Sequence, residues 1–396
     1  MKKIMILGAS ILQLPAIIEA KEMGLEVIVV DMNKDAIGKK AADIFLEIST
    51  IDIPKVIEAA KQYRIDGIMT LASDMPMRTV ASVAKELGII GISEETAINA
   101  TNKGRMRECL HHYNVPIPIF YKVDTYERYL EALHSFKDRC VVKPTDNSGS
   151  RGVFLIKDLH DKQAIDYAYE YSKLYSRSGD IIIEEYMEGF EVSVETISVD
   201  GVVHVIAITD KLTTGLPNFV EMGHSQPSKL SADVKEKIIE VATAAVKAIG
   251  IENGPSHTEI IVTSDGPKIV ELGARLGGDN ITTHLAPLST GVDMVRACIK
   301  IALGEKPDIT PKYQLASAIR YFKNPQGMIQ KISGIEQAQS LKGVQQISFV
   351  KNNGDIAKEI NNSSDRIGFV ISQAETVEEA VNICERAIDI IKIEVI

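Results

Sequence analysis

The sequence of 396 residues has few cysteines, no long apolar run and no excess of basic residues. Its four cysteines are scattered without CxxC spacing, which argues against a disulfide framework or a zinc site and favours free thiols in a reducing compartment. No apolar run reaches about 18 residues, so no membrane span is expected. The net charge of −10 argues against nucleic acid as a partner, because nucleic-acid binders usually carry a basic face.

Two common nucleotide motifs and a targeting signal are also missing. No GxxxxGK[ST] segment occurs, which excludes a P-loop. The segment GASILQ (residues 8–13) has one glycine where a dinucleotide fingerprint needs GxGxxG, so it predicts a tight strand–helix turn, although Asp31 ends the second strand where a ribose-binding acid would sit. The N-terminal MKKIMILGAS lacks the apolar core and cleavage site of a signal peptide. These absences predict a cytoplasmic location.

Residues 1–98 alternate short β-branched runs with helical periodicity. Strands are predicted at 3–8, 26–31 and 67–73, and helices at 11–23, 54–63 and 76–87. Such alternation predicts an α/β domain built on a doubly wound parallel sheet.

A different pattern, with longer strands and hairpin signals, follows in residues 99–305. A helix is predicted over 99–115, strands at 140–156, 181–210 and 257–272, and further helices at 124–136, 160–175, 231–249 and 291–303. This pattern predicts an α+β domain. The polar, proline-punctuated GEKPDITPK (304–312) is typical of a boundary, and residues 306–396 predict a small C-terminal α/β domain.

The segment TEIIVTSDGPKIVELGAR (258–275) predicts a hairpin that brings two acids together. A three-residue loop at 264–266 pairs Thr263 with Pro267 and sets Glu259 opposite Glu271 on one face. Opposed like charges destabilise a strand pair unless something neutralises them, and Mg²⁺ takes oxygen ligands. The alternatives are two solvent-facing glutamates or a slipped register. Arg275, just beyond the strand, could hold anionic oxygens bidentately.

The stretch VVKPTDNSGSRGV (141–153) places Lys143 at the end of a strand and a donor-rich loop, 145–152, after it. Such loops cradle phosphates, although a Gly/Ser loop is more often a plain hairpin tip. The occurrence of Lys143 and Lys103 with two facing glutamates and an arginine in one chain favours a nucleoside-triphosphate site.

These motifs occur in a specific order, and together they resemble a known family. NKGRMR, VVKPTDNSGSRGV, IIIEEYMEGFEVSVE and TEIIV…KIVELGARLGGD resemble the phosphate-binding, hinge and metal-binding segments of an ATP-grasp carboxylate–amine ligase, almost end to end. The resemblance implies an ATP-grasp fold with a pre-ATP-grasp domain (1–98), an ATP-grasp domain with central and lid parts (99–305) and a C-terminal α/β domain (306–396).

The resemblance also implies roles for individual residues. Arg275, Lys143 and His224 are the expected catalytic residues. Glu259 and Glu271 are the expected ligands of Mg²⁺, or of Mn²⁺ in its place. The expected ATP-binding residues are Lys103, Lys143, Ser148, Gly149, Ser150, Gly152, Glu184, Glu185, Met187 and Glu191.

One departure from the family pattern bears on the substrate. Many members carry Asn two residues after the second glutamate, where this chain has Gly273. ELGARLGGD therefore resembles the amino-acid ligase branch more than the biotin carboxylase or carbamoyl-phosphate branches. His224, in GHSQPSKL, resembles a substrate- or phosphate-facing histidine, with a surface residue as the alternative. Asp279 is expected to meet a substrate amino group, and Asp210 and Lys211 could line the same cleft.

The expected activity is ATP-dependent ligation of a small-molecule carboxylate and an amine through an acyl phosphate, with a small amino acid as the carboxylate. One alternative is a phosphoribosylamine–glycine ligase-like purine enzyme of the same fold. Others are a non-catalytic ATP-binding module and a nicotinamide oxidoreductase. Because the family often dimerises, a homodimer is also expected.

Overall fold

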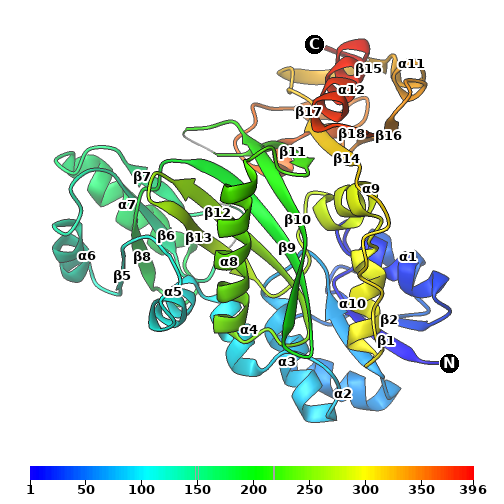
Figure 1. Cartoon of the computed structure of the whole chain (residues 1–396), viewed down its shortest axis with the longest axis horizontal. Helices are drawn as coiled ribbons and strands as arrows, with labels where there is room; N and C mark the ends of the chain where they lie inside the picture. Colours follow the sequence, from blue (N-terminus) through cyan, green and yellow to red (C-terminus); the bar gives the residue numbers. More distant parts are fainter. Residues whose placement is uncertain (148, 150, 217–218) are drawn as a thin grey trace.

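The structure, a computed structural model, describes residues 1–147, 149, 151–216 and 219–396. Its N-terminal part is a parallel sheet with the strand order β3-β2-β1-β4 (Figure 1). The elements are β1 (Lys3–Leu7), α1 (Leu14–Glu22), β2 (Glu26–Val30), η1 (Ile37–Lys40), β3 (Ile44–Leu46), α2 (Ile53–Tyr63), β4 (Gly67–Thr70) and α3 (Pro76–Leu87). The predicted parallel sheet is confirmed, and β3 is a short strand that the sequence pattern did not indicate.

Both faces of this sheet are covered, which explains why its strands are apolar without alternation. Met5 and Leu7 belong to the core that α2 and α3 contribute to, while Ile4 and Ile6 belong to the core shared with α1. Asp31 directly follows β2, and its carboxylate accepts hydrogen bonds from the backbone N–H groups of Ala9, in the turn after β1, and of Asn33, both at 2.8 Å. Asp31 thus holds the strand–helix turn in place.

A smaller antiparallel sheet, ordered β5-β8-β6-β7, contains the strand that carries Lys143. Its strands are β5 (Phe120–Val123), β6 (Cys140–Pro144), β7 (Phe154–Ile156) and β8 (Ile181–Glu185), with helices α6 (Tyr126–Leu133) and α7 (Lys162–Tyr175). Tyr129 and Tyr169 from these helices are buried with Val142 and Ile183 in one core. The sheet therefore fixes Lys143 at the end of a rigid strand.

A long antiparallel sheet, ordered β13-β12-β9-β10-β11-β14-β18-β16, forms the centre of the molecule (Figure 1). Its strands are β9 (Phe190–Val199), β10 (Val202–Thr213), β11 (Glu221–Gln226), β12 (Gly254–Thr263), β13 (Gly266–Gly273), β14 (Ala316–Tyr321), β16 (Val344–Phe349) and β18 (Gly368–Ala374). Because β11 pairs with β14, one sheet crosses the boundary placed at residue 305. The domain limits stay a prediction.

The single helix predicted over 99–115 is wrong. The structure has two helices, α4 (Glu94–Thr101) and α5 (Lys103–His112), joined at Asn102. Asn102 has φ −134° and ψ 113°, which is extended backbone, and its side chain accepts a hydrogen bond from the N–H of Arg105 at 3.0 Å. Asn102 is thus an N-cap, which periodicity alone does not reveal. The break places Lys103 at the first turn of α5.

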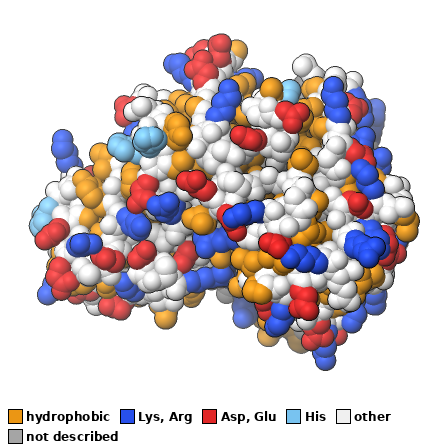
Figure 2. Space-filling model, turned by 90° about the horizontal axis from the view of Figure 1, so that it is seen from below, with side chains coloured by type: hydrophobic (Ala, Val, Ile, Leu, Met, Phe, Trp, Pro, Cys, Tyr) orange, Lys and Arg blue, Asp and Glu red, His pale blue; other side chains and the backbone are white. Residues whose placement is uncertain are grey.

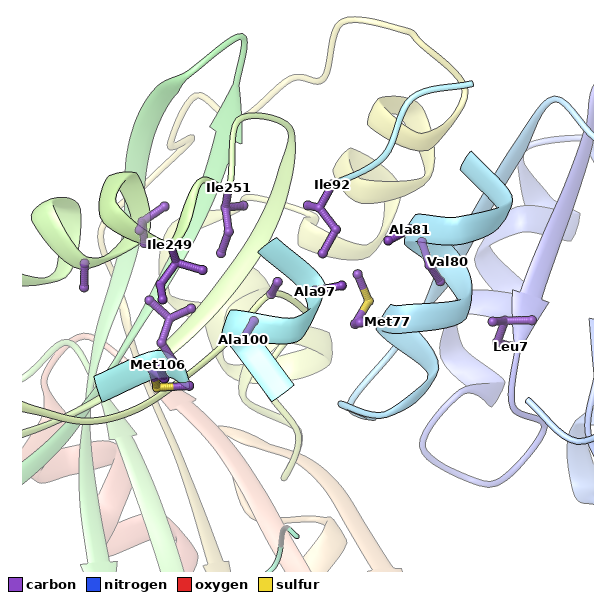
Figure 3. Packing of buried hydrophobic residues seen from close by; sticks show 14 of the residues in the cluster. Leu7, Met77, Val80, Ala81, Ile92, Ala97, Ala100, Met106, Ile249 and Ile251 are labelled. Carbon is purple, nitrogen blue, oxygen red and sulfur yellow. The ribbon is translucent and has the colours of Figure 1, made fainter. Parts of the chain in front are cut away.

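Helices α3, α4 and α5 join the N-terminal sheet to the central sheet. Their buried apolar side chains share one core with α8 (Ala232–Ile249) and its following residues (Figure 3). The residues labelled there are Leu7, Met77, Val80, Ala81, Ile92, Ala97, Ala100, Met106, Ile249 and Ile251. This continuous core holds the two sheets in a fixed relation.

The C-terminal region adds a small sheet ordered β17-β15-β19 beside the end of the central sheet (Figure 1). The remaining elements are η2 (Ile281–Leu285), α9 (Ala286–Thr290), α10 (Met294–Ala302), β15 (Gly327–Ser333), α11 (Ile335–Gln339), β17 (Ile356–Ala357), η3 (Ser363–Asp365), α12 (Val377–Ile390) and β19 (Lys392–Val395). Helix α12 begins with a capping box between Thr376 and Glu379.

The molecular surface mixes charges of both signs. On the face drawn in Figure 2, acidic and basic side chains are interspersed with apolar ones rather than gathered by sign. Within the described ranges, none of the helices combines the length and hydropathy that crossing a membrane requires.

Gly189, between β8 and β9, is a position where the fold tolerates no side chain. A Cβ there would lie 2.1 Å from the carbonyl oxygen of Val262, which is backbone of β12. We expect Gly189→Ala to lower the free energy of unfolding by about 1–3 kcal/mol through overpacking, measured by urea denaturation. In the control Gly278→Ala, the new Cβ would meet Ala72 at 3.7 Å, an ordinary contact, and stability should change by less than about 0.5 kcal/mol. Equal stability of the two variants would contradict the predicted clash.

Candidate active site

The predicted pairing of Glu259 with Glu271 is confirmed, but the predicted hairpin loop is wrong. The last pair of the hairpin is Thr263 with Gly266, so the connection has two residues instead of three. A register shift between Glu259 and Ile260 then restores the pairing of the two glutamates. Such a shift marks a β-bulge, which adds one residue to one strand and re-aims its side chains. Loop and bulge offset each other, which is why the sequence register still placed the acids correctly.

The two glutamates line a cleft of about 600 Å³ between the β5-β8-β6-β7 sheet and the central sheet. Most of the residues predicted to bind ATP or metal line it. They are Lys103, Lys143, Gly149, Glu184, Glu185, Met187, Glu191, Glu259 and Glu271. Gly152 is not among the lining residues; its φ is +79° and its carbonyl accepts a hydrogen bond from Ser172 Oγ at 2.7 Å, so it shapes the loop. Ser148 and Ser150 lie outside the described residues.

Lys103 connects the hairpin to the loop that follows β6. Its Nζ donates to Glu271 Oε1 at 2.7 Å and to the carbonyl oxygen of Asn147 at 2.8 Å. Its backbone N–H donates to the carbonyl of Thr145 at 2.7 Å. The ammonium group is therefore placed between a carboxylate and the loop predicted to hold phosphates.

Lys143 belongs to a buried cluster with Glu184 and Arg107. Its Nζ lies 2.6 Å from Glu184 Oε2, and Arg107 donates from Nε to Glu184 Oε1 at 2.7 Å and from Nη2 to Oε2 at 3.2 Å. Burial alone would raise the pKa of Glu184, but Arg107 and Lys143 outweigh it and lower the pKa to about 2. Burial lowers the pKa of Lys143, and the neighbouring cations add to that effect. The Glu184 carboxylate thus holds the ammonium group of Lys143 in place.

This arrangement limits how the hinge after β8 can meet an adenine base. The Glu184 carboxylate is taken by two cations, and that of Glu185 accepts from the backbone N–H of Ile119 at 3.1 Å. We therefore expect any adenine contacts to come from backbone groups of the hinge and from Met187, which lines the cleft.

Lys211, on β10, is surrounded by carboxylates from neighbouring strands of the central sheet. Its Nζ is 2.5 Å from Glu191 Oε1, 2.9 Å from Glu259 Oε1 and 3.6 Å from Glu221 Oε1. Burial would lower the pKa of Lys211, but the surrounding carboxylates outweigh it and raise the pKa. Each of the two facing glutamates thus has a protein ammonium group beside it, Lys103 or Lys211.

The donor set fits Mg²⁺. Among the residues that the structure describes, no group of three or more His, Cys, Asp or Glu side chains forms a metal cage. Mg²⁺ is commonly bound through one or two carboxylates together with substrate phosphates and waters, so Glu259 and Glu271 facing a nucleotide cleft supply the protein's share.

A second cleft of about 340 Å³ adjoins the first and shares Lys211, Glu221, Glu259 and Glu271 with it. Arg275 lines this cleft, and its Nε donates to Asp74 Oδ1 at 2.8 Å. Asp74 follows β4, so the N-terminal sheet contributes to the wall. The guanidinium group of Arg275 is thereby held beside the hairpin that carries Glu259 and Glu271, as predicted from its spacing.

His224 and Asp279 also line the second cleft. His224 is 1% exposed and its Nε2 lies 3.5 Å from Asp279 Oδ2, so the alternative of a surface histidine is wrong. Arg366 donates to both oxygens of Asp279, at 2.8 and 2.7 Å. The expected free carboxylate for a substrate amino group is therefore already paired.

Sequence reasoning missed Arg107, Asp74 and Arg366. A signal existed for two of them. Arg107 is four residues after Lys103 on one helix, and therefore on the same face. Asp74 follows the carboxyl end of a parallel strand, where ligands bind in α/β sheets. Arg366 is 87 residues from Asp279 and had no local signal.

Comparison with known proteins agrees with this geometry. Residues 136–283 match the family model of the ATP-grasp domain, and residues 320–395 match that of L-amino acid ligase C-terminal domain 2. The chain thus contains an ATP-grasp domain and a C-terminal domain of the L-amino acid ligase type. ATP-grasp domains use ATP together with Mg²⁺.

Relatives of this ATP-grasp chain include several ligases. Alanine–anticapsin ligase of Bacillus subtilis is 28% identical over 278 residues, which cover 65% of this chain and 58% of that ligase, less than two thirds of its length. Phosphoribosylamine–glycine ligase of Methanocaldococcus jannaschii is 28% identical over 378 residues, 87% of this chain and 83% of the relative. The crystal structure of the L-amino acid ligase from Bacillus licheniformis superposes with a TM-score of 0.86 at 25% identity, covering 100% and 99% of the two chains.

The buried Glu184 cluster predicts a pH dependence of stability. The carboxyl pKa is about 2 when folded and 4.5 in its ordinary state, so the cluster's contribution of about 3 kcal/mol is present above pH 4.5 and lost as pH falls towards 2. Glu184→Gln lacks this contribution. The gap in unfolding free energy between wild type and Glu184→Gln should therefore narrow by about 1–2 kcal/mol between about pH 6 and 3.5 in urea denaturation.

Glu240→Gln, at an exposed position, is the matched control. Its gap from wild type should stay constant over the same pH range. A constant gap for Glu184→Gln as well would contradict the assigned low pKa.

Proposed function

We propose that the protein is an ATP-dependent carboxylate–amine ligase that releases ADP and forms an amide through an acyl phosphate, with a small amino acid as the carboxylate. The observation that carries this proposal is the junction of the two clefts. Glu259 and Glu271 line both, so phosphates held in the first cleft end beside Arg275 in the second. Phosphoryl transfer depends on such positioning and charge neutralisation more than on a protein nucleophile.

In this proposal the first cleft holds ATP. Lys103 and Lys143 bind its phosphates under the loop that contains Gly149, and Glu191 accepts hydrogen bonds from the ribose. Lys103 donates to a carboxylate oxygen of Glu271 and to the carbonyl oxygen of Asn147, and phosphate oxygens would accept from the same ammonium group. Mg²⁺ between Glu259 and Glu271 would neutralise charge on the phosphates.

The second cleft holds the carboxylate substrate. Arg275, kept in place by Asp74, offers its remaining N–H groups to the substrate carboxylate. A carboxylate oxygen attacks the γ-phosphorus and ADP leaves. The amine nitrogen then attacks the acyl carbon, and inorganic phosphate leaves with the transferred oxygen. Arg275 and His224, both lining this cleft, stabilise the anionic oxygens during these steps.

An amino acid as the carboxylate agrees with several observations. Alanine–anticapsin ligase and L-amino acid ligase are named for amino-acid substrates, and the C-terminal match is to the L-amino acid ligases. A phosphoribosylamine–glycine ligase must bind a sugar phosphate in addition to glycine, which calls for further cationic side chains in the cleft. In the described part of the second cleft, Lys211 and Arg275 are each bonded to carboxylates. The purine-type enzyme is therefore the second candidate.

We also expect a homodimer in the cytoplasm. All four cysteines are free thiols, which agrees with a reducing compartment where ATP is plentiful.

Hydroxylamine trapping tests the proposed function. With Mg-ATP, hydroxylamine and single amino acids, at least one amino acid should give a hydroxamate together with stoichiometric ADP, because hydroxylamine intercepts the acyl phosphate. Glu271→Gln, which removes the expected metal contact, should lower the yield by about 100-fold or more. ADP release that requires phosphoribosylamine together with glycine, and a hydroxamate from no amino acid other than glycine, would replace this reading with the purine-type one.

A further inference from the structure

Arg366 comes from the C-terminal region and reaches the wall of the second cleft. It precedes β18, in the loop that follows η3, and is 9% exposed. Its guanidinium group stacks on the ring of Tyr321 at 3.9 Å from the ring centre. Its Nε donates to the carbonyl of Ser363 at 2.9 Å. These contacts fix the plane of the guanidinium group before any contact with the cleft is counted.

The fixed guanidinium group bonds to two segments that line the second cleft. Its Nη1 and Nη2 donate to the two oxygens of Asp279 at 2.8 and 2.7 Å. Its Nη1 also donates to the backbone carbonyl of Glu221 at 3.1 Å. Asp279 lies four residues after Arg275, and Glu221 lies three residues before His224 on β11. Arg366 therefore ties together the two segments that carry the proposed substrate-facing side chains.

The backbone conformation of the turn at Asp279 needs side-chain contacts of this kind to hold it. Asp279 has φ +49° and Asn280 has φ +62°, both in the left-handed region. Residues other than glycine hold such a conformation at a cost and persist in it where surrounding contacts impose it. The side chain of Asp279 is held by Arg366 and His224.

Arg366 also decides the charge of the cleft wall. Arg366 and His224 outweigh the effect of burial and lower the pKa of Asp279, so this carboxylate is anionic. Without the guanidinium group, the Asp279 carboxylate would lose its two short charge-assisted bonds and keep the 3.5 Å contact with His224, beside the site proposed for a substrate carboxylate. Like charges in a partly buried cleft repel, and an orphaned charge is more costly than the loss of the pair itself.

We propose that Arg366 is a positioning residue through which the C-terminal region shapes and neutralises the carboxylate-binding half of the cleft. It acts through Asp279 and Glu221 and does not itself touch the reacting atoms. Of its two partners, Glu221 also lines the first cleft, where ATP is proposed to bind, but Arg366 bonds to the backbone carbonyl of Glu221 and not to its carboxylate. This inference rests on the proposed ligase function for its kinetic test.

The test compares Arg366→Gln, Asp279→Asn and the double variant, using Mg-ATP and the amino acid that gives wild type its highest hydroxamate yield. Arg366→Gln should raise the KM for that amino acid by at least about tenfold, while the Kd for ATP, measured by calorimetry without amino acid, stays within about twofold. The double variant should recover most of the loss, because it removes the orphaned carboxylate as well. Arg366→Lys, which keeps the charge but not the fork, should fall between wild type and Arg366→Gln.

Arg296→Gln, which removes an exposed arginine paired with Glu19, is the matched control and should leave the KM unchanged. An unchanged KM in Arg366→Gln, an equal loss of ATP affinity, or a double variant no better than Arg366→Gln would overturn the proposal.

Hydrogen exchange separates this inference from the proposed function. Arg366→Gln should speed amide exchange in peptides covering 274–285 and 219–226, and leave the peptide covering 140–147 unchanged. If no amino acid gives a hydroxamate, the ligase proposal fails, and hydrogen exchange alone then tests the role of Arg366. Unchanged exchange in the first two segments would overturn the role of Arg366.

Discussion

The site is organised by the close approach of two carboxylates, Glu259 and Glu271, across neighbouring strands. Like charges in register destabilise a hairpin, so the pair persists because neutralising groups surround it. Lys103, from the first turn of α5, meets Glu271, and Lys211, from β10, meets Glu259. The break at Asn102 that places Lys103, and the bulge that aligns the two acids, both serve this arrangement.

Each cation around this pair is in turn held by structure outside it. Glu184 and Arg107 fix Lys143 in a buried cluster, and Asp74 from the N-terminal sheet holds Arg275. The C-terminal region reaches the same cleft through Arg366. The N-terminal sheet, the central sheet and the C-terminal region therefore converge on one junction, where the cleft proposed for ATP meets the cleft proposed for the substrate carboxylate.

Much of this was visible in the sequence because it depends on local patterns. The alternation in residues 1–98 predicted the parallel sheet, and period-two spacing placed Glu259 opposite Glu271 even though the loop length was wrong. Side-chain partners were harder to predict, because they depend on packing between distant segments. Glu184 reads as a hinge residue, yet burial between two cations decides its role. Asp279 reads as free to bind an amino group until Arg366, distant in the chain, is placed beside it.

The central claim is that a substrate carboxylate attacks ATP at the junction of the two clefts, and oxygen transfer tests it most directly. The amino acid with the highest hydroxamate yield, labelled with ¹⁸O in its carboxylate, would be turned over with Mg-ATP and an amine. Mass spectrometry of the released phosphate should then show one ¹⁸O atom per turnover, because the attacking oxygen stays on phosphorus when the amine displaces phosphate. Release of ADP with unlabelled phosphate would contradict an acyl phosphate and the account built on it.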